Sequence, residues 1–147
     1  MTKISAQLRA EKSRDVMWEQ DKATQWFGMT CESIGPGEAV VSMKIELHHC
    51  NGHKTCHGAV SYALADSAFA FACNSYNQAC VAQHNSITYL AAAFAGDVLT
   101  ARATEVSRVG RSGIYDIRVT NQNNETIAEF RGGSRMIKGT HFDEENP

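Results

Sequence analysis

The feature that most constrains this chain is a run of 42 residues, 55–96, that carries a single charged side chain. Charged residues make up 20% of the whole chain, yet the only one between Lys54 and Asp97 is Asp66. Because an unpaired charge is costly to remove from water, a stretch this poor in charge is expected inside the folded protein. Its one carboxylate then needs an explanation.

The first half of this stretch predicts a buried helix. Residues 59–75 are rich in alanine, and apolar side chains recur at spacings of three and four residues, at Val60, Leu64, Ala68 and Phe71. This spacing places them along one side of a helix. Because the other sides are nearly as apolar, we expect the rest of the protein to surround the helix.

Strands are predicted around this helix. Residues 39–47 alternate between apolar and polar side chains, the period of a half-buried strand, and further strands are predicted at about 79–90, 98–106, 114–120 and 126–137. Turns at 110–113 and 121–124 join the last three strands. Consecutive strands favour an antiparallel sheet with helix on one face, so we predict an α+β fold in which five strands curl around one buried helix.

We predict a single domain over residues 1–147, with an N-terminal helical segment at 1–27 and a flexible polar tail at 139–147. Residues 5–27 look helical, and Gly28 is a plausible end of that helix. A chain of 147 residues can form a hydrophobic core without metal or disulfide support.

Composition also limits compartment and partners. The chain has five cysteines, an odd number, and its first 20 residues lack the apolar core of a signal peptide. We therefore predict reduced thiols and a cytoplasmic location. The net charge of −2 gives no overall basic field, and no apolar run is long enough to span a bilayer, so we expect neither nucleic acid nor a membrane as partner.

Asp66 lies in the middle of the predicted helix, where aspartate is unfavourable because its side chain competes for backbone hydrogen bonds. A structural role, facing solvent or bonding buried backbone, is one interpretation. Ala63, Ala70 and Cys73 share its helix face and argue against full exposure. A carboxylate in apolar surroundings has a raised pKa and is suited to act as a general base, so a catalytic role is the other interpretation.

The loop before the helix offers a second candidate. Gly58 stands at the predicted helix start, where backbone N–H groups have no helical partner and carry partial positive charge. Glycine lets a ligand carbonyl approach closely, so this N–H is a candidate donor to a developing oxyanion. Asp66 lies eight residues further, about 12 Å along the helix axis. If both groups act on one substrate, they come from two subunits. An ordinary capped loop is the alternative.

A zinc site is a competing interpretation of this loop. Six potential ligands fall within ten residues: His48, His49, Cys50, His53, Cys56 and His57. Their spacing fits no standard zinc finger or ribbon, and the chain has no Cys-x-x-Cys pair. We predict no metal site.

Taken together, several motifs resemble one enzyme family. They are Asn51-Gly52-His53, Cys56-His57-Gly58, the helix sequence at 64–70 and Phe-Ala-Gly-Asp at 94–97, with further likeness at 72–75, 113–117 and 130–132. Over about residues 26–139 the chain resembles the phenylacetate-degradation (PaaI-type) acyl-CoA thioesterases of the hotdog-fold superfamily. The resemblance implies an antiparallel sheet of five to six strands wrapped around a central buried helix. It also implies a homodimer or homotetramer with active sites at the dimer interface.

The resemblance implies a hydrolase acting on thioester bonds. Such an enzyme splits an acyl-CoA, of aryl-acetyl or medium-chain type, into free acid and CoA without a separate cofactor, because coenzyme A is part of the substrate. The resemblance also assigns Asp66 as general base or nucleophile and the Gly58 N–H as the group that polarises the carbonyl. Asn51 would hold water or substrate, and His57 would adjoin the carbonyl. Asp66 would come from one subunit, with Asn51 and Gly58 from the other.

The chain departs from the family pattern at two places. Ala59 stands where a second glycine is common, and Ala92-Ala93 stand where many members have Arg-Pro. Without that arginine, the CoA phosphates need other partners. Arg108 and Arg111, beside a strand turn, are candidates, and a solvated hairpin is the alternative.

Two other functions stay open. A hotdog-fold enoyl-CoA hydratase or dehydratase needs a carboxylate and a histidine together at the loop to move a water proton. Here the loop offers Asn51 with His57, and asparagine cannot act as a base. A non-catalytic acyl-CoA-binding module is the third hypothesis.

Overall fold

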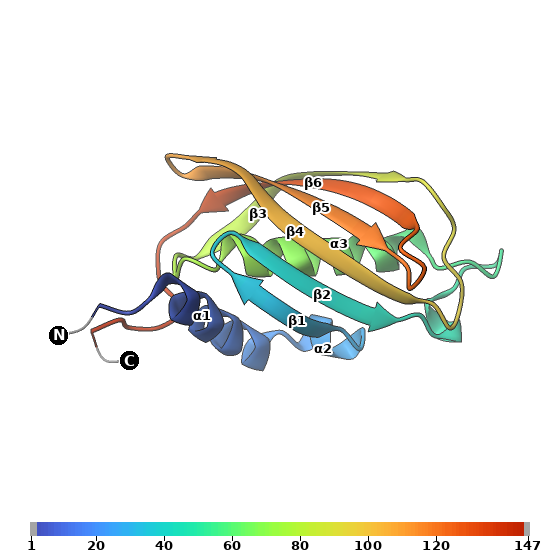
Figure 1. The fold of residues 1–147 in the computed structure, drawn as a ribbon, viewed down its shortest axis with the longest axis horizontal. Coiled ribbons are helices and arrows are strands. Elements are labelled where there is room, and N and C mark those ends of the chain that lie inside the picture. The colour runs from blue at the N-terminus through green and yellow to red at the C-terminus, as the bar shows by residue number, and fades with distance from the viewer. Residues whose placement is uncertain (1–2, 146–147) are drawn as a thin grey trace.

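An antiparallel sheet of six strands curls over one long helix in the computed structural model, which describes residues 3–145 (Figure 1). The first two and last two residues of the predicted domain lie outside the described residues. The strands stand in the order β1-β2-β4-β5-β6-β3. Their bounds are β1 Thr30–Gly35, β2 Glu38–Lys44, β3 Cys80–Tyr89, β4 Val98–Val109, β5 Ser112–Thr120 and β6 Thr126–Met136. The predicted α+β layout is confirmed, with six strands.

Two short helices precede the sheet where one continuous helix was predicted. Helix α1 spans Ala6–Gln20 and α2 spans Lys22–Trp26. The break falls at Asp21, whose side chain accepts a hydrogen bond from the backbone N–H of Thr24 and so caps the start of α2. Gly28, with a φ of +76°, follows the end of α2 in the left-handed region that glycine favours.

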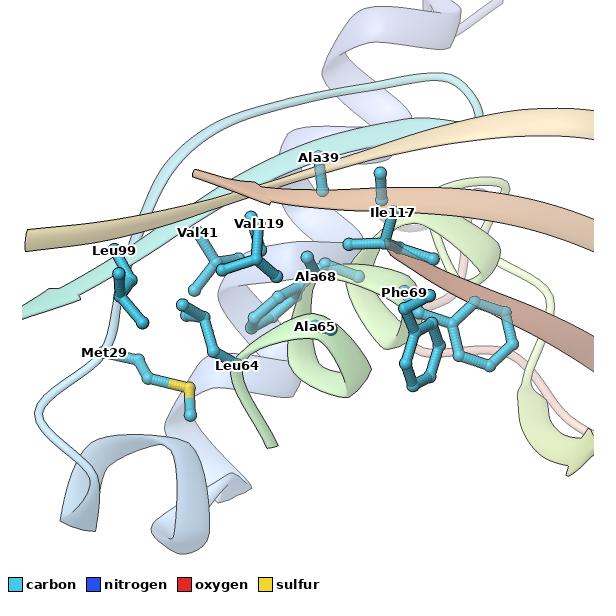
Figure 2. Packing of buried hydrophobic residues seen from close by; sticks show 14 of the residues in the cluster. Met29, Ala39, Val41, Leu64, Ala65, Ala68, Phe69, Leu99, Ile117 and Val119 are labelled. Carbon is cyan, nitrogen blue, oxygen red and sulfur yellow. The ribbon is translucent and has the colours of Figure 1, made fainter. Parts of the chain in front are cut away.

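The central helix α3 spans Gly58–Cys73 and packs against strands β2, β4 and β5. Small alanines on its packed side let the sheet approach closely, and Figure 2 shows the two sets of side chains meeting. They are Leu64, Ala65, Ala68 and Phe69 from α3, and Val41, Leu99, Ile117 and Val119 from the strands. The close fit extends to Gly132 on β6, where an added Cβ would lie 2.8 Å from the ring of Phe69.

Only one side of α3 is enclosed, which corrects the prediction of a helix surrounded on all sides. Apart from exposed Ala59 in the first turn, the other side is partly exposed, and its residues recur at helical spacing: Tyr62, Ala63, Asp66, Ser67 and Ala70. We call these five residues the open face of α3. They border β3, which forms one edge of the sheet and is largely exposed, with Val81 46% accessible.

The predictions also miss one strand and overextend another. Strand β1 went unpredicted because a bulge between Cys31 and Ser33 breaks its alternation of buried and exposed residues. The predicted strand at 39–47 ends at Lys44, and Leu47 is 83% exposed in the short 3₁₀ helix η1, Leu47–His49. The backbone N–H of Glu46 donates to His49 Nδ1, a contact that fixes this turn.

We predicted a flexible tail at 139–147. Its described residues, up to 145, contact the rest of the protein. The amide of Asn77 bonds the backbone of His141 and Phe142, and Glu144 forms an ion pair with Arg9 of α1 at 2.6 Å. The described ends of the chain therefore lie side by side (Figure 1).

Candidate active site

The start of α3 presents one unpaired backbone donor. His57 caps the helix, and its Nδ1 accepts a hydrogen bond from the N–H of Ala59 at 2.9 Å. The N–H of Val60 donates to the carbonyl of His57. Within residues 3–145 the N–H of Gly58 donates to no group. The predicted oxyanion donor therefore lies at a helix N-terminus with its hydrogen unused.

Gly58 accommodates the close approach of Tyr89, which lies 31 residues further along the chain. The hydroxyl of Tyr89, at the end of β3, donates to the carbonyl of Gly58 at 2.7 Å. A Cβ on residue 58 would lie 3.0 Å from that hydroxyl oxygen. The glycine therefore makes room for a tyrosine of the same chain, in addition to any ligand.

A cavity of ≈390 Å³ opens beside Gly58. Its volume lies in the range of small-molecule sites. The wall is formed by the end of the loop, the first turn of α3, the end of β3 with the segment that follows it, and one residue of β6. The lining residues are Thr55, Cys56, Gly58, Ser61, residues 89–93 and Ile127. Ala92 and Ala93, which replace the Arg-Pro of many family members, are thus part of this wall.

Asn51 shapes the loop in front of the cavity. Its Oδ1 accepts hydrogen bonds from the backbone N–H groups of His53 and Thr55 and from the hydroxyl of Thr55. Across the base of the same loop, Cys50 and Cys56 pair as an isolated antiparallel bridge. The amide oxygen of Asn51 is therefore engaged within the loop, and Asn51 does not line the cavity.

Asp66 is half-buried on the open face of α3, and a side chain rather than backbone is its partner. Its Oδ1 accepts a hydrogen bond from the side-chain amide of Asn85 on β3 at 3.1 Å. Burial raises the pKa of the Asp66 carboxyl above its ordinary value, the Asn85 hydrogen bond opposes this rise, and the charge of Asp21 adds to it. The raised pKa expected of a carboxylate in apolar surroundings is thus present.

One chain does not bring Asp66 and Gly58 together. Both lie on the unbroken helix α3, separated by about 12 Å of axial rise, and Asp66 is absent from the cavity wall. The ring of His57 is exposed beside Gly58. The structure therefore separates the predicted site residues into two groups, with Gly58 and His57 at the helix start and Asp66 on the open face.

Asn85, the residue that contacts Asp66, was not predicted from the sequence. The strand β3 alternates here, with Asn85 and Ile87 directed inward and their neighbours exposed. An amide at an inward position of a strand beside the helix was the available signal. The same amide also donates to the hydroxyl of Tyr62 at 3.0 Å.

The two candidate arginines lie far from Gly58. The guanidinium of Arg108 stacks on the ring of Tyr76 at 3.5 Å and lies 3.7 Å from a carboxylate oxygen of Glu105. Arg111 lines a separate cavity of ≈420 Å³ together with Gln78 and Lys138. Both arginines lie near the C-terminal end of α3, about 24 Å of helix away from its start.

The histidines and cysteines of the loop are not arranged around a common point. No group of three or more His, Cys, Asp or Glu side chains in the described part of the chain is placed to hold a metal ion. His49 is buried, and the pKa of its ring is lowered by burial. Among the helices of residues 3–145, none is long and apolar enough to cross a membrane.

Comparison with known proteins decides the family. Residues 53–128 match the model of the Thioesterase superfamily. The chain belongs to the thioesterase superfamily. It is 42% identical to the acyl-coenzyme A thioesterase PaaI of Escherichia coli over 132 aligned residues. The alignment covers 90% of this chain and 94% of that protein.

Solved structures of superfamily members agree in fold. The PaaI protein from the phenylacetic acid degradation operon of Escherichia coli superposes with a TM-score of 0.91 at 41% identity, covering 92% of this chain and 99% of that one. A mutant of the phenylacetic acid degradation protein PaaI from Thermus thermophilus gives a TM-score of 0.77 at 34% identity, covering 80% and 100%. The predicted PaaI-type hotdog fold is confirmed.

Proposed function

We propose that this chain hydrolyses the thioester bond of an acyl-CoA to a free acid and CoA. The observation that carries the proposal is the presence on one helix of two groups, a half-buried carboxylate with a raised pKa and a backbone N–H at the helix start that no described residue accepts. The 42% identity to the acyl-coenzyme A thioesterase PaaI of Escherichia coli supports the same activity.

The chemistry follows from these two groups. As general base, the Asp66 carboxylate takes a proton from water, and the water oxygen bonds to the thioester carbon. Negative charge develops on the carbonyl oxygen, where one preorganised N–H such as that of Gly58 contributes about 3 kcal/mol. The carbon–sulfur bond then breaks, and the CoA thiolate takes up the proton. Direct attack by Asp66 on the carbonyl carbon is the alternative route.

The active assembly we propose is a homodimer, or a homotetramer built from such dimers. A second copy covering the open face of α3 and the edge of β3 would bring Asp66 of one subunit to the partner's Gly58 and the partner's Asn51. The separation of about 12 Å within one chain supports such an arrangement. The outer edge of β3 also pairs with no strand among the described residues, which leaves it available to a second copy.

The substrate we propose is an aryl-acetyl or medium-chain acyl-CoA, with CoA entering only as part of the substrate. The apolar side chains after β3 and Ile127 line the cavity beside Gly58 and would receive an apolar group. For the CoA phosphates, exposed Arg111 beside Lys138 is better placed than Arg108, which Tyr76 and Glu105 already engage. Neither a metal nor a further cofactor takes part, so prolonged dialysis against a chelator should leave turnover unchanged.

A thiol-release assay on a panel of aryl-acetyl and fatty acyl-CoA esters tests the activity. Asp66→Asn should lower kcat by about 10²- to 10⁴-fold, because it keeps the shape but removes the base. Asp15→Asn, on exposed α1, is the matched control and should leave kcat unchanged. Full activity in Asp66→Asn would refute this mechanism, and hydration of crotonyl-CoA without thiol release would establish the hydratase alternative. A stable CoA-ester complex without turnover would establish a binding module.

A pair of variants tests the donor at residue 58. Gly58→Pro removes the N–H at the first helical position, where proline is tolerated, and should lower kcat about 10²- to 10³-fold. Gly58→Ala adds a comparable contact with Tyr89 but keeps the N–H, so it controls for crowding. Equal losses in both variants would contradict the donor role.

Mixing two inactive variants tests the shared site. Co-refolded Asp66→Asn and Gly58→Pro subunits form about half heterodimers, each with one intact site, so about a quarter of the wild-type activity should return. No recovery would show that Asp66 and Gly58 act within one chain.

A further inference from the structure

The amide of Asn85 bridges two side chains one turn apart on α3. Its Nδ2 donates to the Asp66 carboxylate at 3.1 Å and to the Tyr62 hydroxyl at 3.0 Å. Both donor hydrogens are thereby used, and the orientation of the amide is fixed, because a reversed amide would set its oxygen against the carboxylate. Tyr62 is itself held by edge contact with the ring of Phe130 at 5.2 Å.

The acceptor of the same amide has no partner. Asn85 Oδ1 is buried from solvent and accepts no hydrogen bond from any group in the described part of the chain. Buried acceptors of this kind are rare, and a catalytic role is one explanation for them. Because the amide carries its oxygen and its nitrogen on one carbon, this open acceptor adjoins the carboxylate that Nδ2 contacts.

We propose that Asn85 positions the Asp66 carboxylate and accepts a hydrogen bond from the hydrolytic water beside it, an inference that rests on the proposed function. One hydrogen of the water is directed to Asp66 and the other to Asn85 Oδ1, which orients the oxygen lone pair toward the thioester carbon. Asp66 takes the first proton as the carbon–oxygen bond forms. When the carbon–sulfur bond breaks, the leaving thiolate takes that proton, so one water is consumed and the carboxylate is regenerated. This geometry favours the general-base route over attack by Asp66 itself.

The charges around Asp66 give the inference a measurable consequence. Asp21 at the start of α2 disfavours ionisation of Asp66, and so does burial, whereas Asn85 on β3 favours it. The remaining titratable neighbours on α3 are Tyr62 and Cys73. The contact with Cys80 and burial raise the pKa of Cys73, so its thiol stays uncharged. Losing the Asn85 donor therefore raises the pKa of Asp66. As the pH is lowered, the variant then loses activity at a higher pH than the wild type does.

Asn85→Leu is the first test, because it keeps the branching of the side chain and removes both polar atoms. At pH 8 we expect kcat to fall about tenfold with little change in KM, and the acid limb of the kcat/KM profile to move to higher pH. Asn123→Leu, in the exposed turn between β5 and β6, is the matched control and should keep the wild-type profile. The melting temperature and the subunit assembly of each variant are measured alongside.

Asn85→Asp sharpens the test. It keeps the shape and an acceptor but places a second carboxylate against Asp66, and like charges raise the pKa of one member of the pair. Its acid limb should therefore move further than that of Asn85→Leu. Tyr62→Phe removes the other contact of the amide and keeps the Asp66 contact, so it should change kcat by no more than about fivefold, the fold-change that corresponds to one neutral hydrogen bond.

The outcomes separate this inference from the proposed function. If Asp66→Asn is inactive while Asn85→Leu keeps the wild-type kcat and acid limb, Asn85 is structural and the inference is overturned. The inference is also overturned if Asn85→Leu has a lower melting temperature or fails to assemble while the acid limb of its pH profile stays where the wild type has it. If Asp66→Asn stays active, the proposed function itself fails. As a direct readout, carbon NMR titration of the Asp66 carboxyl should show a higher pKa in Asn85→Leu than in the wild type.

Discussion

The two sides of α3 differ in what surrounds them and therefore in what they can do. On the packed side, Leu64, Ala65 and Ala68 are fully buried against the strands. On the open face, Asp66 and Tyr62 are only partly covered, and both accept a hydrogen bond from the amide of Asn85. The packed side is complete within one chain. Beside the open face lie a half-buried carboxylate and an acceptor without a partner among the described residues. Both groups lower the stability of the fold, and a catalytic role is a reason for a protein to keep them.

The largest expected effect on stability lies on the packed side. Leu64→Ala should lower the free energy of unfolding by about 2–5 kcal/mol, since it leaves a cavity between α3 and the sheet. Val16→Ala, at an exposed position of α1, should lower the free energy of unfolding far less. Denaturant unfolding of both variants measures the difference, and a small loss in Leu64→Ala would mean that the packed side is not the main core.

A smaller effect is expected where the sheet approaches α3 most closely. Gly132→Ala would place a methyl group 2.8 Å from the ring of Phe69 and should destabilise the fold by about 1–3 kcal/mol. Gly52→Ala is the control, because a Cβ there meets nothing within 4 Å. If thermal unfolding shows the same change for both variants, the tight contact with Phe69 is not needed.

On the open face the expected change in stability has the opposite sign. The folded protein raises the pKa of Asp66, so it binds a proton there more readily than the unfolded chain does. Ionising Asp66 therefore costs stability as pH rises from the ordinary aspartate pKa of about 4 through the raised value. Asp66→Asn should melt higher than the wild type at pH 7 and lose this advantage toward pH 4. A variant that melts lower at pH 7 would contradict the raised pKa.

The smallest effect is expected at the boundary between the two sides. Tyr89→Phe removes the hydrogen bond to the Gly58 carbonyl and keeps the ring against the glycine, so stability should fall by about 0.5–1.5 kcal/mol. Because the Gly58 N–H stays in place, kcat should change little in the thiol-release assay. A large fall in kcat would show that Tyr89 acts on the substrate itself.

Much of the fold could be predicted because its signals are local. The period of two in residues 39–45 and the alanine-rich spacing of 59–75 predicted β2 and α3, and consecutive strands predicted the antiparallel sheet. Local signals also misled where a single residue changed the backbone. Asp21 caps a new helix within the predicted one, and the bulge in β1 hides its alternation.

The candidate site was predictable only in part. Asp66 stood out because it is the sole charge in an apolar stretch, and Gly58 because it begins a helix. The contacts of Asn85 with Asp66 and of Tyr89 with Gly58 were not predicted, since these partners lie 19 and 31 residues apart along the chain. Contacts over such distances depend on how β3 lies beside α3, and periodicity within either element carries no information on that.

The sequence by itself determined which segments form helix and strand, that the central helix is apolar, and that one carboxylate lies within it. Those properties follow from side-chain type and spacing. Only the tertiary structure decided that one side of α3 stays open, that Tyr89 closes on Gly58, and that Asn85 meets Asp66 with its own oxygen unpaired. The physical reason is that these features come from the packing of distant segments, whose geometry is set by the whole core.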